Sequence, residues 1–101
     1  NEWRYKMAFE YKVNFNINGK ECILEEIGDL LKNKYETIEN YNNCICINNK
    51  TEKWKELASI EIIETGYFFI TILNRNERNN IIDTIKTILQ KYDIDFKIEE
   101  V

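Results

Sequence analysis

The alternating stretch near the start of the chain, residues Trp3–Ile17, reads WRYKMAFEYKVNFNI. Its odd positions are apolar and its even positions are polar or charged, with Ala8 as the exception. Alternation with a period of two places the two sets on opposite faces of a β-strand. A straight strand of this length is too long for so small a domain, so we expect a bend or bulge at Ala8.

The dipeptide Asn18–Gly19 follows this stretch directly. Asn-Gly is typical of a tight hairpin turn, because both turn residues adopt a positive φ. It predicts a return strand from Lys20 to Leu24, and the competing interpretation is a helix that begins at Glu21. Farther along, apolar residues spaced three and four apart, preceded by acidic residues, predict a helix near residues 25–38.

The middle of the chain predicts three further strands. Asn40 to Asn43 indicates a polar break, and the next four residues, CICI at 44–47, form a short apolar run typical of a buried strand. Thr51 to Leu57 is interpreted as a helical turn. Ser59 to Glu64 and Tyr67 to Leu73 then predict two strands of a hairpin around Gly66.

The last third of the chain predicts a second helix and a final strand. An apolar stripe at helical spacing follows Asn74 and Asn76, either of which is a suitable N-cap. Ile94 to Glu99 alternates again and indicates a strand. The residues expected to be buried between the helices and the sheet are Tyr5, Phe9, Val13, Ile27, Leu30, Ile85, Ile88 and Leu89.

This order of elements predicts an α+β domain that spans residues 1–101. Strands outnumber helices and several are joined by short turns, which favours a mainly antiparallel sheet of five to six strands with two helices packed on one face. The chain has 101 residues, which is the length of one domain.

Charge and composition exclude several classes of function. The formal net charge is −4, so the positive excess that nucleic acids and anionic membranes require is missing. No apolar run approaches the roughly 20 residues of a membrane span. The three cysteines do not resemble a secreted disulfide framework, so we expect a cytoplasmic protein with reduced thiols.

Catalytic machinery is not recognisable in the chain. It contains no His, which excludes Ser-His and Cys-His nucleophiles. Cys44 and Cys46 are spaced as C-x-C rather than as in structural zinc sites, and Cys22 is a conceivable third ligand. Free cysteines usually pack as small apolar residues, so we expect all three thiols to be buried in the core and metal-free. We therefore predict neither an enzyme nor a cofactor.

A small acidic domain without catalytic groups is similar in kind to immunity proteins that neutralise bacterial toxins, and to phage anti-defence proteins. The likeness is one of type and assigns no residues. It implies a non-catalytic inhibitor that occludes a basic partner, such as a nuclease toxin, with charge that speeds encounter. The alternative is a regulatory domain that binds a small molecule.

The expected contact lies within residues 36–56, where the signal for secondary structure is weakest, because binding residues concentrate on such connections. The residues expected to bind the partner are four acids and two aromatic residues: Glu36, Glu39, Tyr41, Glu52, Trp54 and Glu56. An aromatic anchor ringed by charge is the usual form of a binding hot spot. The rival site is an acidic end formed by Asp93, Asp95, Glu99 and Glu100, beside Glu25, Glu26 and Asp29.

Overall fold

A computed structural model describes residues 8–16, 18–35, 38–41, 43–52 and 55–101. In chain order the elements are β1 (Phe9–Asn14), α2 (Lys20–Leu31), β2 (Ile38–Tyr41), β3 (Cys44–Asn48), β4 (Glu56–Ile63), β5 (Gly66–Thr71), α3 (Arg75–Lys91) and β6 (Lys97–Glu100). The strands form one six-stranded sheet in the order β2-β3-β4-β5-β1-β6, and every neighbouring pair is antiparallel. The predicted α+β class is confirmed.

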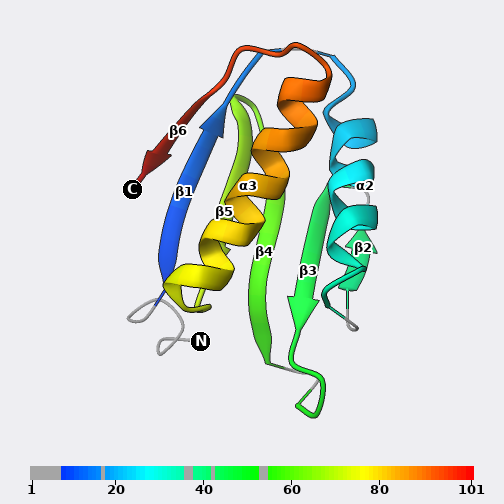
Figure 1. Ribbon diagram of the computed structural model, residues 1–101, viewed down its shortest axis with the longest axis vertical. Coiled ribbons are helices and arrows are strands. Elements are labelled where there is room, and N and C mark those ends of the chain that lie inside the picture. Colours follow the sequence, from blue (N-terminus) through cyan, green and yellow to red (C-terminus); the bar gives the residue numbers. More distant parts are fainter. Residues whose placement is uncertain (1–7, 17, 36–37, 42, 53–54) are drawn as a thin grey trace.

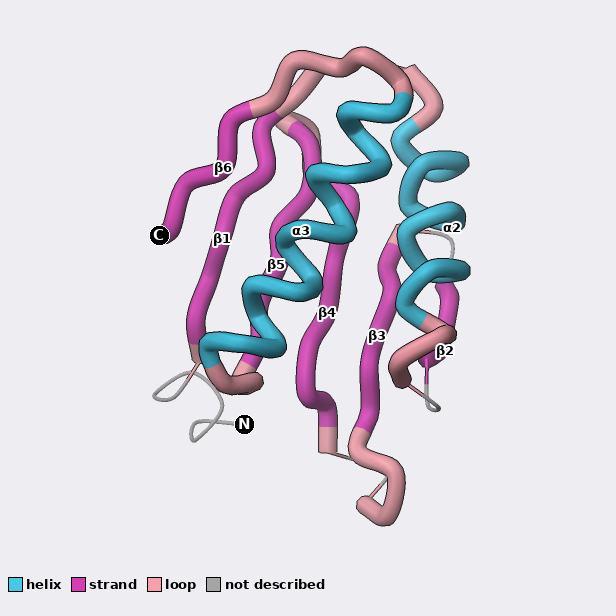
Figure 2. Tube along the Cα trace, viewed as in Figure 1, coloured by secondary structure: helices cyan, strands magenta, loops and turns pink. Residues whose placement is uncertain are grey.

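Both helices cover the same face of the sheet, as predicted (Figure 1). The helix α3 crosses the part of the sheet that contains β1, β5 and β4, and α2 lies over β3 and β2 (Figure 2). The core fills the space between the two layers and includes Val13, Ile60, Phe69 and Ile85. Tyr67 is fully buried there, and its hydroxyl donates to the carbonyl of Lys20 at 2.8 Å, which ties the first turn of α2 to the sheet.

The alternating stretch forms β1, which is the strand beside the β4–β5 hairpin. Its odd residues Tyr11 and Val13 are buried against the helices, as is Phe15 just beyond it. The prediction that Phe9 is buried is wrong: its ring is 37% exposed, because it lies at the end of the strand with the Arg78 guanidinium 3.7 Å from its centroid. Tyr5 and the residues before Ala8 lie outside the described residues.

The predicted hairpin at Asn18–Gly19 is wrong, because the helix α2 begins at Lys20. Gly19 does have a positive φ, of 85°, but it precedes a helix instead of turning a hairpin. Ile23, Leu24, Ile27 and Leu31 lie at helical spacing and bury one face of α2. A return strand over Lys20–Leu24 would not have placed these four side chains on one face. The competing interpretation of a helix near Glu21 was therefore the better one.

The predicted helix over 25–38 also has the wrong limits, since α2 ends at Leu31. Leu30, which was predicted to be buried, is 41% exposed because it points away from the sheet. At Gly28 the helix comes so close to the sheet that an added Cβ would lie 3.0 Å from Ile45 Cδ1 and 3.1 Å from Asn40 Oδ1. This close approach fixes α2 over β2 and β3.

Two connections differ from the sequence prediction. Residues 40 and 41 belong to β2 and are not part of a polar break, because β2 pairs with β3 from Ile38 to Tyr41. The predicted helical turn over 51–57 is also wrong, since Glu56 and Leu57 begin β4. The turn before it is held by Asn49, whose side-chain oxygen accepts bonds from the backbone N–H groups of Thr51 and Glu52 at 3.0 Å.

The second half of the fold agrees with the prediction, except that the last strand begins at Lys97 rather than at Ile94. β4 and β5 form the hairpin around Gly66, and α3 is capped by Asn74, whose side chain accepts from the N–H of Glu77 at 3.0 Å. Gly66 is required, since a Cβ there would lie 1.9 Å from the carbonyl oxygen of Val13. No helix among the described residues is long and apolar enough to cross a membrane.

Candidate functional site: the open face of the sheet

The two faces of the sheet have different chemistry, because side chains alternate along each strand. In β3 and β4 the residues that face the helices are buried and include Ile45, Ile47 and Ile60. Their neighbours in the sequence point to the other side, which neither helix covers (Figure 1). We call this side of β2–β5 the open face. Its residues are Glu39, Tyr41, Cys44, Cys46, Glu56, Ser59, Glu61, Phe68 and Ile70.

The register of the strands determines which side chains are neighbours on this face. Cys46 lies between Glu39 of β2 and Ser59 of β4, and Cys44 lies between Tyr41 and Glu61. Directly opposed residues of antiparallel strands point to the same face, with their Cβ atoms about 4.5–5.5 Å apart. The pairing therefore gathers two thiols, two carboxylates and a phenol on one patch of three strands.

Tyr41 is the most exposed aromatic residue of the open face. It lies on β2, at the edge of the sheet, and 58% of its surface is exposed. Its hydroxyl donates a hydrogen bond to the carboxylate of Glu39, and this bond, followed by the charge of Glu39, raises the pKa of the Tyr41 hydroxyl. The ring is therefore held beside a carboxylate while remaining available for contact.

The thiols of Cys44 and Cys46 lie at the centre of the open face, and their sulfur atoms are 3.7 Å apart. Partial burial raises the pKa of both thiols, and that of Cys46 reaches about 12, with the neighbouring Cys44 and the acids Glu56 and Glu39 adding to the shift. Both thiols are therefore protonated at neutral pH, when they are poor nucleophiles. The prediction that the cysteines pack in the core is wrong: these two are half-buried, and Cys22 is exposed on α2.

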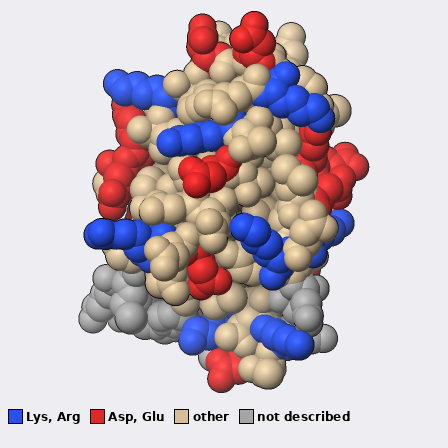
Figure 3. All heavy atoms as spheres, viewed as in Figure 1, with Lys and Arg blue, Asp and Glu red and all other residues tan. Residues whose placement is uncertain are grey.

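The charge of the open face is negative. The strands β2, β3 and β4 contain three acidic residues, Glu39, Glu56 and Glu61, and no Lys or Arg. On the helix side, in contrast, Lys and Arg alternate with Asp and Glu across the surface (Figure 3). The open face therefore combines carboxylates with partly apolar groups, namely the thiols, Phe68 and Tyr41.

The six residues predicted to bind a partner fall into three groups. Glu39, Tyr41 and Glu56 lie on the open face. Glu52 is exposed in the turn between β3 and β4. Glu36 and Trp54 lie outside the described residues. Sequence reasoning missed Glu61 and Phe68, although their alternation with buried Ile60 and Phe69 could have indicated that they share the other face.

The rival acidic end is only partly assembled. Glu26 accepts hydrogen bonds from Lys91 and from the hydroxyl of Tyr92, which lower the pKa of the carboxyl, so its charge is already paired with that of Lys91. Glu99 and Glu100 lie on β6 at the far edge of the sheet, opposite Lys12 and Tyr11. These acids therefore do not form one cluster.

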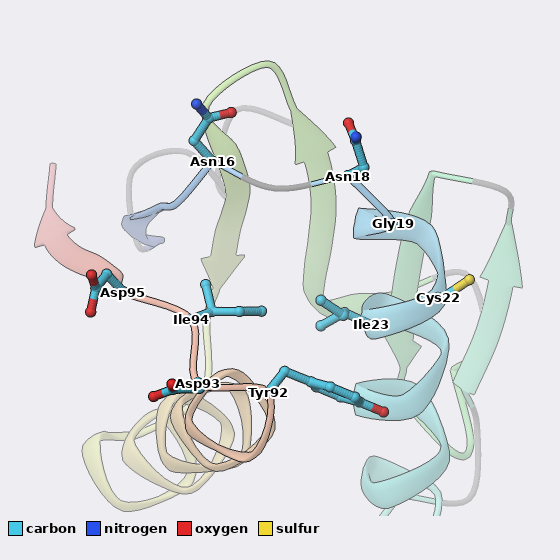
Figure 4. Close-up of a pocket in the computed structure, with 9 residues that line it drawn as sticks. All are labelled: Asn16, Asn18, Gly19, Cys22, Ile23, Tyr92, Asp93, Ile94 and Asp95. Atoms are coloured by element: carbon cyan, nitrogen blue, oxygen red, sulfur yellow. The ribbon is translucent and has the colours of Figure 1, made fainter.

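A cavity of about 770 Å³ opens at the same end, between the start of α2 and the chain after α3. Ile23 and Ile94 point toward each other across it, whereas Asp93 and Asp95 point away (Figure 4). Asn16 and Asn18 lie on its rim. The walls of the cavity are thus mainly apolar, and its polar lining comes from the two amides and from Asp93 and Asp95. An apolar cavity with a few polar groups is the lining expected for a small organic molecule.

Among the described residues no three or more Cys, Asp or Glu side chains are arranged around a common point that could hold a metal ion. Cys22 is on the helix layer, so it cannot serve as the third ligand of Cys44 and Cys46 that the sequence left open. Comparison of the chain with protein-family models, with curated proteins and with solved structures finds no match in any of the three.

Proposed function

We propose that this domain is a non-catalytic inhibitor that binds a basic protein through the open face of its sheet. The observation that supports this proposal is the combination of an exposed Tyr41, three carboxylates and the absence of Lys and Arg on β2, β3 and β4. A cationic surface on the partner would face these carboxylates, and immunity proteins that neutralise toxins are the class of inhibitor that this mode of action resembles.

The arrangement of groups on the open face fits the anatomy of a protein interface. Its thiols and Phe68 are half-buried, and Glu61 lies between Cys44 and Phe68. Tyr41 is exposed on the edge strand β2, beside the carboxylate of Glu39. Aromatic residues are enriched among the hot spots of protein interfaces, and the carboxylates suit a cationic partner surface.

Inhibition by this route needs no chemistry in the inhibitor. The carboxylates accelerate encounter with a basic partner, and Tyr41 then anchors the complex and excludes water from the contact. Both thiols on the face are protonated at neutral pH, so a covalent bond to the partner is not part of this mechanism. A toxin whose active site is cationic, such as a nuclease, would be blocked by simple occlusion.

A second candidate function is favoured by one observation, the apolar cavity between Ile23 and Ile94. A regulatory domain would bind a small molecule there, with its amide rim supplying hydrogen bonds from Asn16 and Asn18. Tyr92 lines this cavity and is far from the open face in the sequence and in the fold. It therefore serves as the matched tyrosine that separates the two proposals.

The experiment captures partners with the tagged chain, identifies and purifies the captured protein, and measures its affinity for two variants. Tyr41→Ala should weaken binding by about 30-fold, since truncating an aromatic anchor typically costs about 2 kcal/mol. Tyr92→Ala should bind as the wild type does. Circular dichroism checks that both variants are folded. Unchanged affinity in a folded Tyr41→Ala variant, or a larger loss in Tyr92→Ala, would refute the proposed site.

A further inference from the structure

The two thiols of β3 are the cluster of side chains whose chemistry the proposed function does not use. Cys44 and Cys46 are two residues apart on a strand, so both point to the open face, and their sulfur atoms are 3.7 Å apart. They line one shallow depression together with Glu56, Ser59 and Glu61. The depression is thus lined by two sulfur donors and surrounded by negative charge.

The separation of the two sulfurs suits a shared metal ion. Metal–thiolate bonds of about 2.3 Å each, as in zinc sites, hold two sulfurs about 4.6 Å apart when the ion lies on the line between them, and closer when the angle at the ion is smaller. The observed separation is 3.7 Å, so the two sulfurs need to move apart by less than about 1 Å to hold a two-coordinate ion. A disulfide would instead require a sulfur–sulfur distance of about 2.05 Å, so the two side chains or the strand would have to move.

We propose that Cys44 and Cys46 together form a binding site for monovalent copper. Thiolate sulfur is a soft ligand and selects soft ions such as Cu(I). A closed structural zinc site takes four ligands, and the described residues provide no group of three or more arranged for such an ion. Cu(I), a monovalent ion with a filled d shell, can be coordinated by two thiolates alone. The two thiols present therefore favour Cu(I) over an ion that needs four ligands.

The binding step is balanced without a change of oxidation state. Each thiol releases one proton to solvent, two sulfur–copper bonds form, and copper remains Cu(I). The resulting bis-thiolate complex carries one negative charge, whereas the two thiols carried none. Glu56 and Glu61 of the same depression are hard oxygen donors and do not compete with sulfur for the ion. Their charge opposes the anionic complex, so the affinity comes from the two sulfur–copper bonds.

This inference departs from the expectation that all three thiols are metal-free, because that expectation rested on burial in the core. The structure instead places Cys44 and Cys46 side by side on the face of the sheet that neither helix covers, and both are half-buried rather than enclosed. The copper site does not depend on the proposed inhibitor function, and its test requires no protein partner.

The test titrates the reduced full chain with Cu(I) in the absence of oxygen, in competition with the chromogenic chelator bicinchoninate. We expect one Cu(I) per chain. Cys44→Ser and Cys46→Ser should each lower the affinity at least about 100-fold, because even groups that only orient a metal ligand contribute about 10–100-fold. Cys22→Ser is the matched control, since its thiol is exposed on α2, and it should bind copper as the wild type does.

Circular dichroism of each variant confirms that serine has not unfolded the sheet. Three results would overturn the proposal: no retention of Cu(I) by the wild type against the chelator, equal retention by all three variants, or an equal loss in Cys22→Ser. A parallel titration with Zn(II) tests the choice of ion, and tighter binding of Zn(II) than of Cu(I) would also overturn it.

Discussion

Two neighbouring leucines at the end of α2 provide a sharp test of how the helix lies on the sheet. Leu31 is 1% exposed and packs in the core, whereas Leu30 is 41% exposed. The sequence predicted that Leu30 is buried, so the two substitutions Leu30→Ala and Leu31→Ala distinguish the structure from that prediction. Both remove the same three carbon atoms from adjacent positions of one helix.

The expected losses of stability differ severalfold. Truncating a buried leucine to alanine typically costs about 2–5 kcal/mol, so we expect about 3 kcal/mol for Leu31→Ala. Leu30→Ala should cost less than about 1 kcal/mol, because much of its side chain is already in water and alanine is the better helix former. For a domain of this size, about 4–8 °C of melting temperature corresponds to 1 kcal/mol, so Leu31→Ala should melt roughly 12–24 °C lower.

Urea unfolding followed by far-ultraviolet circular dichroism measures both losses. The slope of the unfolding free energy against urea should be the same for both variants, which shows that the comparison is between equivalent transitions. A domain stability of about 5–15 kcal/mol leaves Leu31→Ala folded in buffer. Losses for the two variants that agree within about 0.5 kcal/mol would show that α2 does not present Leu31 to the core and Leu30 to solvent.

Three further outcomes are expected. Asp93 follows the end of α3 with a φ of 55°, a conformation in which glycine avoids the strain of a Cβ atom. Asp93→Gly should therefore raise the unfolding free energy measured in thermal melts by about 0.5–1 kcal/mol, and a loss of stability would contradict this. Hydrogen bonds from Lys91 and Tyr92 lower the folded-state pKa of Glu26. The stabilisation from this carboxylate is therefore complete above its unfolded-state pKa and is lost as the pH falls through its folded-state pKa. Urea titrations at about pH 5 and pH 3 should show a smaller decline in the unfolding free energy of Glu26→Gln than in that of the wild type. Burial is the main cause that raises the pKa of Cys46, and it remains in a Cys22→Ser/Cys44→Ser background. The alkylation rate of Cys46 in that background should therefore still rise about tenfold per pH unit at about pH 9, and a plateau below that pH would contradict the burial of this thiol.

The sequence was informative wherever one pattern had a single physical outcome. The alternation in Tyr11–Phe15 could only bury one face of a strand, and the apolar stripe after Asn74 could only form a capped helix. Asn18–Gly19 was different, because a positive φ at Gly19 suits either a hairpin or the entry to a helix. Only the packing of Ile23 and Ile27 against the sheet decided between them, and that contact is not local in the sequence.

The candidate site was predictable in its chemistry but not in its layout. Weak local structure and acidic side chains indicated the region of Glu39, Tyr41 and Glu56, and the register of β2, β3 and β4 places these residues on one face. The other residues of the face, Glu61 and Phe68, lie on β4 and β5, whose sequence predicted only a hairpin packed in the core. Which side of a strand is left uncovered depends on where the helices pack, and no local pattern specifies that.

We propose that the open face, rather than acidic charge in general, recruits a basic partner. Glu61→Lys and Asp83→Lys change the net charge equally, but Glu61 is exposed on the open face and Asp83 is exposed on α3 on the other side of the sheet. The association rate with the purified partner, measured by stopped flow at low salt, should be about tenfold lower for Glu61→Lys and nearly unchanged for Asp83→Lys. The two association rates should become equal in about 1 M salt, because screening is strong there. Equal slowing by both substitutions, or no slowing by Glu61→Lys, would show that the open face does not recruit the partner.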